Sequence, residues 1–214
     1  MGEYIRARTP QQKQERINAI LDATEALFEA RPYHEITLSL IAEELGWSRA
    51  NLYKYANTKE EIFLALYTRA NQAYIDQLDA AFKEAELPMP HREFAQRWAA
   101  VAAEHHSYFR YQDILVGIIE TNVTLQRLTE FKGEFYKQIE PVLNLLGRQC
   151  PGLAGQDRWG FYLMLLYQAC ALSIAYNMTP LCQQAMELAG IPTSGRSFNE
   201  QLSSFVEMCL SSTS

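Results

Sequence analysis

The sequence is poor in the residues that build metal centres and disulfide frameworks. Its 214 residues include four cysteines and four histidines, and no two cysteines form a C-x-x-C pair. This scatter argues against a zinc site and against a disulfide-stapled fold. His105 and His106 are adjacent, and adjacent residues on a helix do not share a face, so the two rings cannot act as ligands from one side. We therefore expect no cofactor.

Catalytic fingerprints are missing as well. The chain contains no G-x-S-x-G, no P-loop and no dinucleotide-binding glycine pattern. It also shows no nucleophile–base constellation that would support an enzyme. We therefore expect a protein that is not an enzyme.

Long hydrophobic runs are scarce. The most apolar stretch, Phe161 to Tyr176, is too short to span a bilayer and contains Gln168, so it is predicted to be a buried helix. The first residues are charged and lack the apolar core of a signal peptide. We expect a cytoplasmic protein without a membrane partner.

Strand-type alternation is absent, and the apolar residues recur at helical spacing instead. An all-α fold is therefore expected. Pro141 falls inside one periodic segment and should kink or restart that helix. After residue 57 the expected helices are Thr58 to about Glu86, His91–Tyr108, Tyr111–Thr121, Leu125–Leu146, Gln156–Asn177, Leu181–Ala189 and Phe198–Ser211.

The most informative stretch is Ile36–Ile62, which has the capping and termination signals of two short helices joined by a tight turn. Thr37 and Ser48 are good N-caps, because their hydroxyls can accept from free amides at a helix start. Gly46 stands where a left-handed residue would end the first helix. The second helix is expected over Arg49–Tyr55. This is the layout of a helix-turn-helix DNA reader.

A third helix is expected to follow at once. Thr58 is its predicted N-cap, and Glu61 lies three residues later, which is the spacing of a capping box.

The side chains of the second helix favour DNA over an ordinary surface helix. Arg49 can bond guanine and Asn51 adenine in the major groove, and Lys54 is a further candidate for a base contact. Tyrosine hydroxyls and lysines suit phosphate oxygens. Each residue taken singly favours a plain surface helix, whereas the set together with its caps favours DNA binding. The predicted DNA-binding residues are Thr37, Ser48, Arg49, Asn51, Tyr53, Lys54, Tyr55 and Lys59.

The pattern T-x-x-x-I-A-x-x-L-G-x-S-x-x-x-L-Y-x-Y-x-x-x-K-E-x-[I/L], which this chain fills from Thr37 to Ile62, resembles the TetR family of one-component regulators. The resemblance extends over roughly Gln11 to Leu66. One position departs from it, since the residue after Tyr55 is usually aromatic in that family and is Ala56 here. This change could loosen packing between the second and third helices.

The resemblance implies a helix-turn-helix DNA-binding domain over residues 1–60 and a helical ligand-binding and dimerisation domain over residues 61–214. It also implies a homodimer that binds double-stranded operator DNA and a small-molecule effector, most simply as a repressor. An effector pocket fits the aromatic richness of the second domain. The predicted pocket residues are Trp98, Phe109, Phe131, Phe135, Tyr162 and Tyr167.

Two apolar stripes on the last long helices fit the dimer interface that the resemblance implies, although packing within one protomer would explain them too. The predicted interface residues are Trp159, Leu163, Leu166, Cys170, Leu202, Phe205, Val206 and Cys209.

The net charge of −6 is unusual for a DNA binder. Residues 1–60 carry eight basic and nine acidic side chains, whereas residues 61–214 carry 11 basic and 16 acidic side chains. The N-terminal part is therefore the less acidic of the two. Local potential rather than net charge governs phosphate contact. Two alternatives stay open: a helical small-molecule binder whose N-terminal bundle is only a scaffold, and a helix-turn-helix protein that acts through a protein partner.

Overall fold

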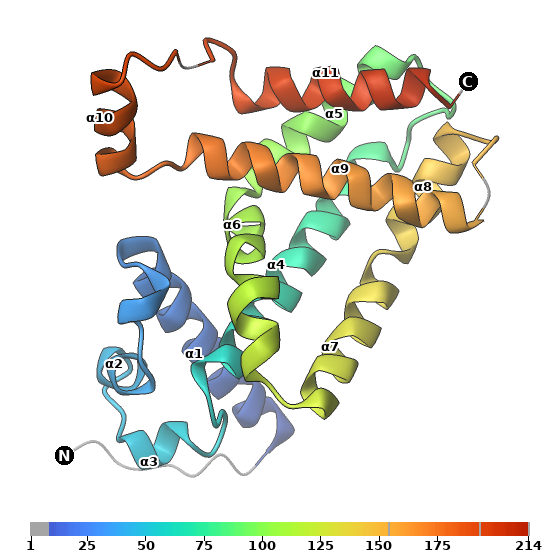
Figure 1. Ribbon diagram of the computed structural model, residues 1–214. Helices are drawn as coiled ribbons and strands as arrows, with labels where there is room; N and C mark the ends of the chain where they lie inside the picture. The colour runs from blue at the N-terminus through green and yellow to red at the C-terminus, as the bar shows by residue number, and fades with distance from the viewer. Residues whose placement is uncertain (1–8, 154, 193, 214) are drawn as a thin grey trace.

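The computed structural model describes residues 9–153, 155–192 and 194–213 (Figure 1), and within these ranges every regular element is helical. The predicted all-α fold is confirmed. Three helices at one end form a small bundle, which we call the head: α1 (Pro10–Ala30), α2 (Leu38–Glu44) and α3 (Arg49–Leu52). The short 3₁₀ helix η1 (Tyr33–Glu35) connects α1 to α2.

Local capping chemistry sets the boundaries of the head, as predicted. The Thr37 hydroxyl accepts from the amide of Leu40, and the Ser48 hydroxyl accepts from the amide of Asn51. Thr58 caps α4 in the same way. The predicted capping box at Thr58 does not form, because the Glu61 carboxylate accepts from the amide of Asn57 instead, at 2.8 Å.

The long helix α4 (Lys59–Phe82) belongs to both parts of the molecule. It packs against α1 of the head and against α5, α6, α7 and α8. The boundary predicted at residue 60 therefore lies in the first turn of a continuous helix, and that division stays a prediction.

The remaining helices form the larger part, which we call the body. They are α5 (His91–Glu104), α6 (His106–Ile114), the π-helical turn η2 (Leu115–Ile119), η3 (Glu120–Asn122), α7 (Leu125–Gln138), α8 (Glu140–Gln149), α9 (Gly155–Tyr176), α10 (Pro180–Leu188) and α11 (Phe198–Ser211). Figure 1 shows α9 and α11 crossing the end of the body away from the head, with α10 standing apart between them.

Several predicted helices differ in extent. The Leu125–Leu146 segment restarts before Pro141, as expected from its ring. The predicted His91–Tyr108 helix ends at Glu104, and α6 begins two residues later. The predicted reading helix Arg49–Tyr55 keeps α-helical bonding only to Leu52, and the chain then forms turns.

A continuous apolar core joins head and body. Its largest fully buried side chains include five tyrosines, whose hydroxyls need partners in an apolar surrounding. Two of them satisfy each other, since the hydroxyls of Tyr67 and Tyr108 lie 3.0 Å apart. The core is therefore aromatic where α4 crosses α6, next to the cavity described below.

A stretch of α9, Asp157–Tyr176, is long and apolar enough to cross a membrane by length and composition alone. Core helices of soluble proteins satisfy the same criteria. In this fold one side of the stretch packs against α6, α8 and α11. Its other side is apolar and exposed.

Candidate functional site

The turn between α2 and α3 is fixed by one glycine. Gly46 has φ +66°, a left-handed conformation that strains any residue with a Cβ. The amide of Gly46 donates to the carbonyl of Glu43 at 2.9 Å, and the amide of Trp47 donates to that of Ala42 at 2.8 Å. These two bonds form a Schellman motif, which ends α2 and sets the direction in which α3 leaves.

The short helix α3 and the turn that follows it expose several polar side chains. Leu52 is fully buried and holds the helix on the core. Arg49 and Lys54 are exposed, Asn51 is half-buried, and Tyr53 is 49% exposed. A four-residue helix cannot be stabilised by its own backbone bonds, so the head must supply a rigid platform for these side chains.

The remaining predicted DNA contacts flank this helix. The oxygens of Thr37 and Ser48 accept capping bonds, which leaves each hydroxyl proton able to donate outward. Tyr55 is half-buried, and its ring centroid lies 5.9 Å from that of Trp47. The Arg16 guanidinium lies 4.9 Å from the Trp47 ring, so a basic side chain of α1 is held beside the reading helix.

The Lys59 ammonium makes several contacts within the protein. Its ammonium donates to the carbonyl of Tyr33 at 3.0 Å and to that of Ile36 at 2.9 Å. It also lies 3.9 Å from the Tyr33 ring centroid. Burial lowers the pKa of Lys59, and the Glu60 carboxylate opposes that shift. These contacts tie η1 and the start of α2 to the start of α4.

A polar network connects the head to α6 of the body. Arg69 on α4 pairs with Asp22 at 2.6 Å and with Glu25 at 2.8 Å, both on α1. The Tyr111 hydroxyl on α6 donates to the same Glu25 at 2.9 Å. Burial and the neighbouring Glu25 raise the pKa of Tyr111, so its hydroxyl keeps this proton. The next residue back, Arg110, donates to the carbonyl of Phe28 at 3.1 Å.

The body contains a cavity of about 290 Å³, which we call the body cavity. It lies among α4, α6 with η2, α7 and α9. Its lining is Tyr67, Gln112, Leu115, Val116, Glu120, Phe131, Lys132, Phe135, Tyr136, Trp159, Leu163, Leu166 and Tyr167.

The walls of the body cavity are mainly aromatic, with few polar groups. Gln112 donates its amide proton to the Tyr67 hydroxyl, and Lys132 pairs with Glu120. Three predicted pocket residues, Phe131, Phe135 and Tyr167, line it. Trp98, Phe109 and Tyr162 are not among its lining residues, and they are buried in the core at 1% exposure or less. Sequence reasoning missed the polar groups, which no pattern distinguishes from surface residues.

The last helices present two different faces. Of the predicted interface residues, Leu166, Leu202, Val206 and Cys209 are buried inside the protomer, and Trp159, Leu163, Cys170 and Phe205 are half-buried. α11 packs most extensively against α5 of the same chain. The exposed side of α9 carries a second apolar stripe at alternating spacings of four and three residues: Gly160, Met164, Tyr167, Ala171 and Ile174.

The four cysteines lie apart from one another in the described part of the chain. Cys150, Cys170, Cys182 and Cys209 are unpaired. Burial raises the pKa of Cys170 to about 12, with Asp113 as a second cause, so this thiol stays protonated. Among the described residues, no three His, Cys, Asp or Glu side chains converge to hold a metal ion.

Two protein-family models match consecutive parts of the chain. The model of bacterial regulatory proteins of the tetR family matches residues 20–66. The model of the tetracyclin repressor-like C-terminal domain matches residues 68–211. Among curated proteins, none matches the chain.

Solved structures with the same fold include several bacterial regulators. A TetR/AcrR-family regulator from Thermobifida fusca aligns with TM-score 0.55 at 17% identity, covering 92% of this chain and 96% of that one. A TetR-family regulator from Marinobacter aquaeolei aligns with TM-score 0.55 at 18% identity, covering 94% and 98%. The fatty acid degradation regulator FadR from Bacillus halodurans aligns with TM-score 0.51 at 17% identity, covering 96% of each chain.

Proposed function

This chain belongs to the TetR family of DNA-binding transcriptional regulators, which are not enzymes, and we propose that it is a homodimeric cytoplasmic repressor released from a palindromic operator by a small molecule. The observation that carries the proposal is the unbroken helix α4. It joins a head with outward polar side chains on α3 to a body that contains an aromatic cavity.

In this proposal α3 enters the major groove. Arg49 and Asn51 read bases, with Lys54 as a further base contact, because these types present donors that match guanine and adenine edges. Thr37, Ser48, Tyr53 and Tyr55 position the head on phosphates. Lys59 holds the head together rather than contacting phosphate, because its ammonium is engaged by two carbonyls and a ring.

The exposed stripe of α9 supports the dimer proposal. Residues spaced alternately by four and three lie along one seam of a helix, and a second copy could cover that seam by helix packing. Tyr167 is 60% exposed and Ile174 is 55% exposed, which is unusual for large apolar side chains on such a regular stripe. Two heads arranged by this dimer would read half-sites about 34 Å apart, one turn of DNA.

The body cavity is the proposed effector site. Its aromatic walls and single ion pair suit a small, mainly apolar molecule with one or two polar groups. Gln112 lines the cavity, while the preceding Tyr111 and Arg110 bond to α1. A ligand that moves α6 would therefore also move the head. It shifts the population only by binding one arrangement more tightly than the other.

Selection of bound sequences from a random DNA pool, at near-physiological salt, tests the DNA-reading part. We expect a palindrome to be enriched by the natural protein and lost or degenerate with Arg49→Ala. Enrichment of the same palindrome by both proteins would remove Arg49 from the base contacts. No enrichment by a folded, dimeric protein in the absence of effector would contradict the repressor proposal.

The effector part needs a separate arm on the same operator. Small aromatic molecules that raise the melting temperature are tested for release of the DNA, with Leu163→Trp as the variant that fills the body cavity. We expect this variant to bind the operator and to resist release. Equal release from both proteins would place the effector elsewhere.

A further inference from the structure

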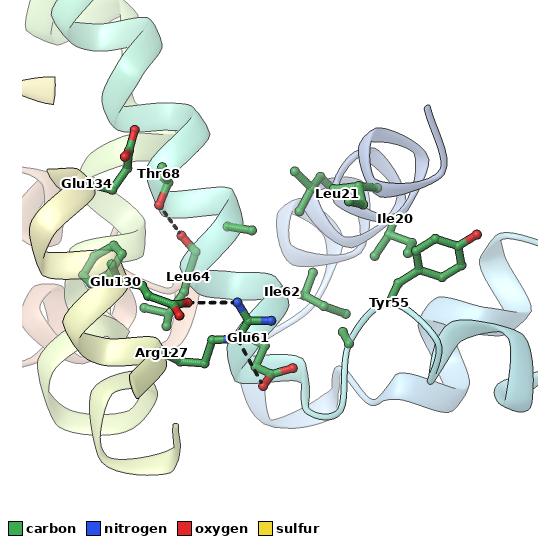
Figure 2. A pocket seen from close by; sticks show the side chains of 14 residues that line it. Ile20, Leu21, Tyr55, Glu61, Ile62, Leu64, Thr68, Arg127, Glu130 and Glu134 are labelled. Atoms are coloured by element: carbon green, nitrogen blue, oxygen red, sulfur yellow. Dashed lines mark hydrogen bonds and ion pairs between the residues drawn. The ribbon is translucent and has the colours of Figure 1, made fainter. Parts of the chain in front are cut away.

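A second cavity lies where the head meets the body. Figure 2 shows side chains of α1 and of the α3–α4 connection on one side of it and side chains of α7 on the other. Its volume is about 380 Å³, within the range of small-molecule pockets. The lining is Ile17, Ile20, Leu21, Tyr55, Ala56, Glu61, Ile62, Leu64, Ala65, Thr68, Arg127, Glu130, Phe131 and Glu134. We call it the junction cavity.

The floor of the junction cavity is apolar and comes largely from the core. Ile20, Leu21 and Ile62 are each at most 6% exposed. Ala56 is also 6% exposed, and its methyl group leaves open the space that a larger side chain would take. Phe131 lines the junction cavity and the body cavity alike. The floor therefore offers contact to a hydrocarbon or aromatic group.

The rim is charged and predominantly negative. Arg127 on α7 lies between two carboxylates, at 3.1 Å from Glu130 and 3.9 Å from Glu61 (Figure 2). A third carboxylate, Glu134, follows one helical turn after Glu130. Among the described residues it has no ion-pair or hydrogen-bond partner. One guanidinium is thus set against three carboxylates, and the uncompensated charge is negative.

We propose that the junction cavity binds a lipophilic organic cation. The apolar body of such a molecule would lie on the floor formed by Ile20, Leu21 and Ala56, and its positive charge would lie beside Glu134 and Glu130. Tyr55 adds an aromatic ring to the lining, and aromatic rings attract cations through their quadrupoles. An anion of the same shape would meet uncompensated carboxylates and is disfavoured. The proposal does not rest on the effector role assigned to the body cavity.

The position of the junction cavity gives such a ligand a regulatory consequence. A bound molecule would touch α1, the start of α4 and α7 together, so its affinity depends on how the head sits on the body. By reciprocity, the cation would change DNA affinity by the same factor by which DNA changes the affinity for the cation.

Isothermal titration of the full-length protein without DNA tests the binding itself. The probes are tetraphenylphosphonium and tetraphenylborate, which are alike in shape and opposite in charge. We expect the cation to bind at least tenfold more tightly than the anion. Ala56→Phe should weaken the cation at least tenfold by occupying the floor, and Glu134→Gln should weaken it about three- to tenfold by removing one nearby charge.

Two further variants separate this site from others. Leu163→Trp fills the body cavity and should leave cation binding unchanged. Glu187→Gln removes an exposed carboxylate on α10, far from the junction, and controls for the net negative charge of the protein. Melting curves establish whether each variant is folded. If Ala56→Phe does not fold, Glu134→Gln still tests the site.

Three results would overturn the proposal. The first is equal affinity for the two probes. The second is that Leu163→Trp abolishes cation binding while Ala56→Phe leaves it unchanged. The third is that Glu134→Gln and Glu187→Gln weaken cation binding equally. Because no DNA is present, each of these results leaves the regulator proposal untouched.

Discussion

Replacing Lys59 with methionine distinguishes a structural lysine from a phosphate contact. Methionine keeps most of the apolar stem and removes the ammonium. That group makes bonds of 3.0 and 2.9 Å to the carbonyls of Tyr33 and Ile36. A shielded charge-assisted bond is worth about 1.5–3 kcal/mol. The Lys59 side chain is only partly buried, so water compensates for much of this. We expect a loss of about 2 kcal/mol in the free energy of unfolding.

Urea denaturation measures that loss, as a lower midpoint at unchanged slope. The second assay is the salt dependence of operator binding. A lost phosphate contact would reduce the slope of log K against log salt by about 0.9 per protomer. We expect Lys59→Met to leave this slope unchanged. The matched variant is Lys54→Met, at an exposed position in the turn that follows α3. We expect it to lower the salt slope and to leave the stability near normal. A stable Lys59→Met protein with a reduced slope would refute the structural role.

Three further perturbations test other parts of the molecule. Arg49→Ala should cost about 1–3 kcal/mol in discrimination at one operator base pair, and an equal loss across all operator variants would argue against base reading. Ile174→Asp should convert dimers to monomers in sedimentation, whereas Leu181→Asp on the exposed helix α10 should not. Asp113→Asn should raise the melting temperature at pH 7.5. Burial raises the pKa of Asp113 to about 6 from 3.8, so its charged form is disfavoured in the folded state. In the natural protein, the stability that depends on a protonated Asp113 is present below pH 3.8 and is lost as the pH rises through 6. The advantage of Asp113→Asn over the natural protein should therefore vanish near pH 4. The gain should stay below about 1 kcal/mol, because the Asp113 side chain is exposed and solvent screens its charge.

The elements that the sequence predicts best are those controlled by neighbouring residues. Thr37, Gly46 and Ser48 act within one turn of their own positions, and the structure places each in its predicted capping or turning role. The restart at Pro141 is equally local, because a proline ring clashes with its own preceding turn. Such rules do not depend on how distant helices cross.

The sites in the body depend on those crossings and were therefore harder to predict. Phe109 and Phe131 look alike in the sequence, yet the first is fully buried among core rings and the second lines a cavity. Similarly, α9 is apolar on more than one side, and its sequence alone does not show which side α6, α8 and α11 cover. Only their packing leaves the stripe containing Met164 and Ile174 exposed.

The shared helix α4 limits how parts of this protein can be exchanged with those of relatives. Each residue added to an α-helix turns everything beyond it by about 100° and advances it by about 1.5 Å. A single inserted residue near Arg69 would therefore rotate the head away from α6 and break the Glu25 contacts. A chimera that carries another regulator's head must keep the residue count of α4, because the register of this helix sets how the head sits on the body.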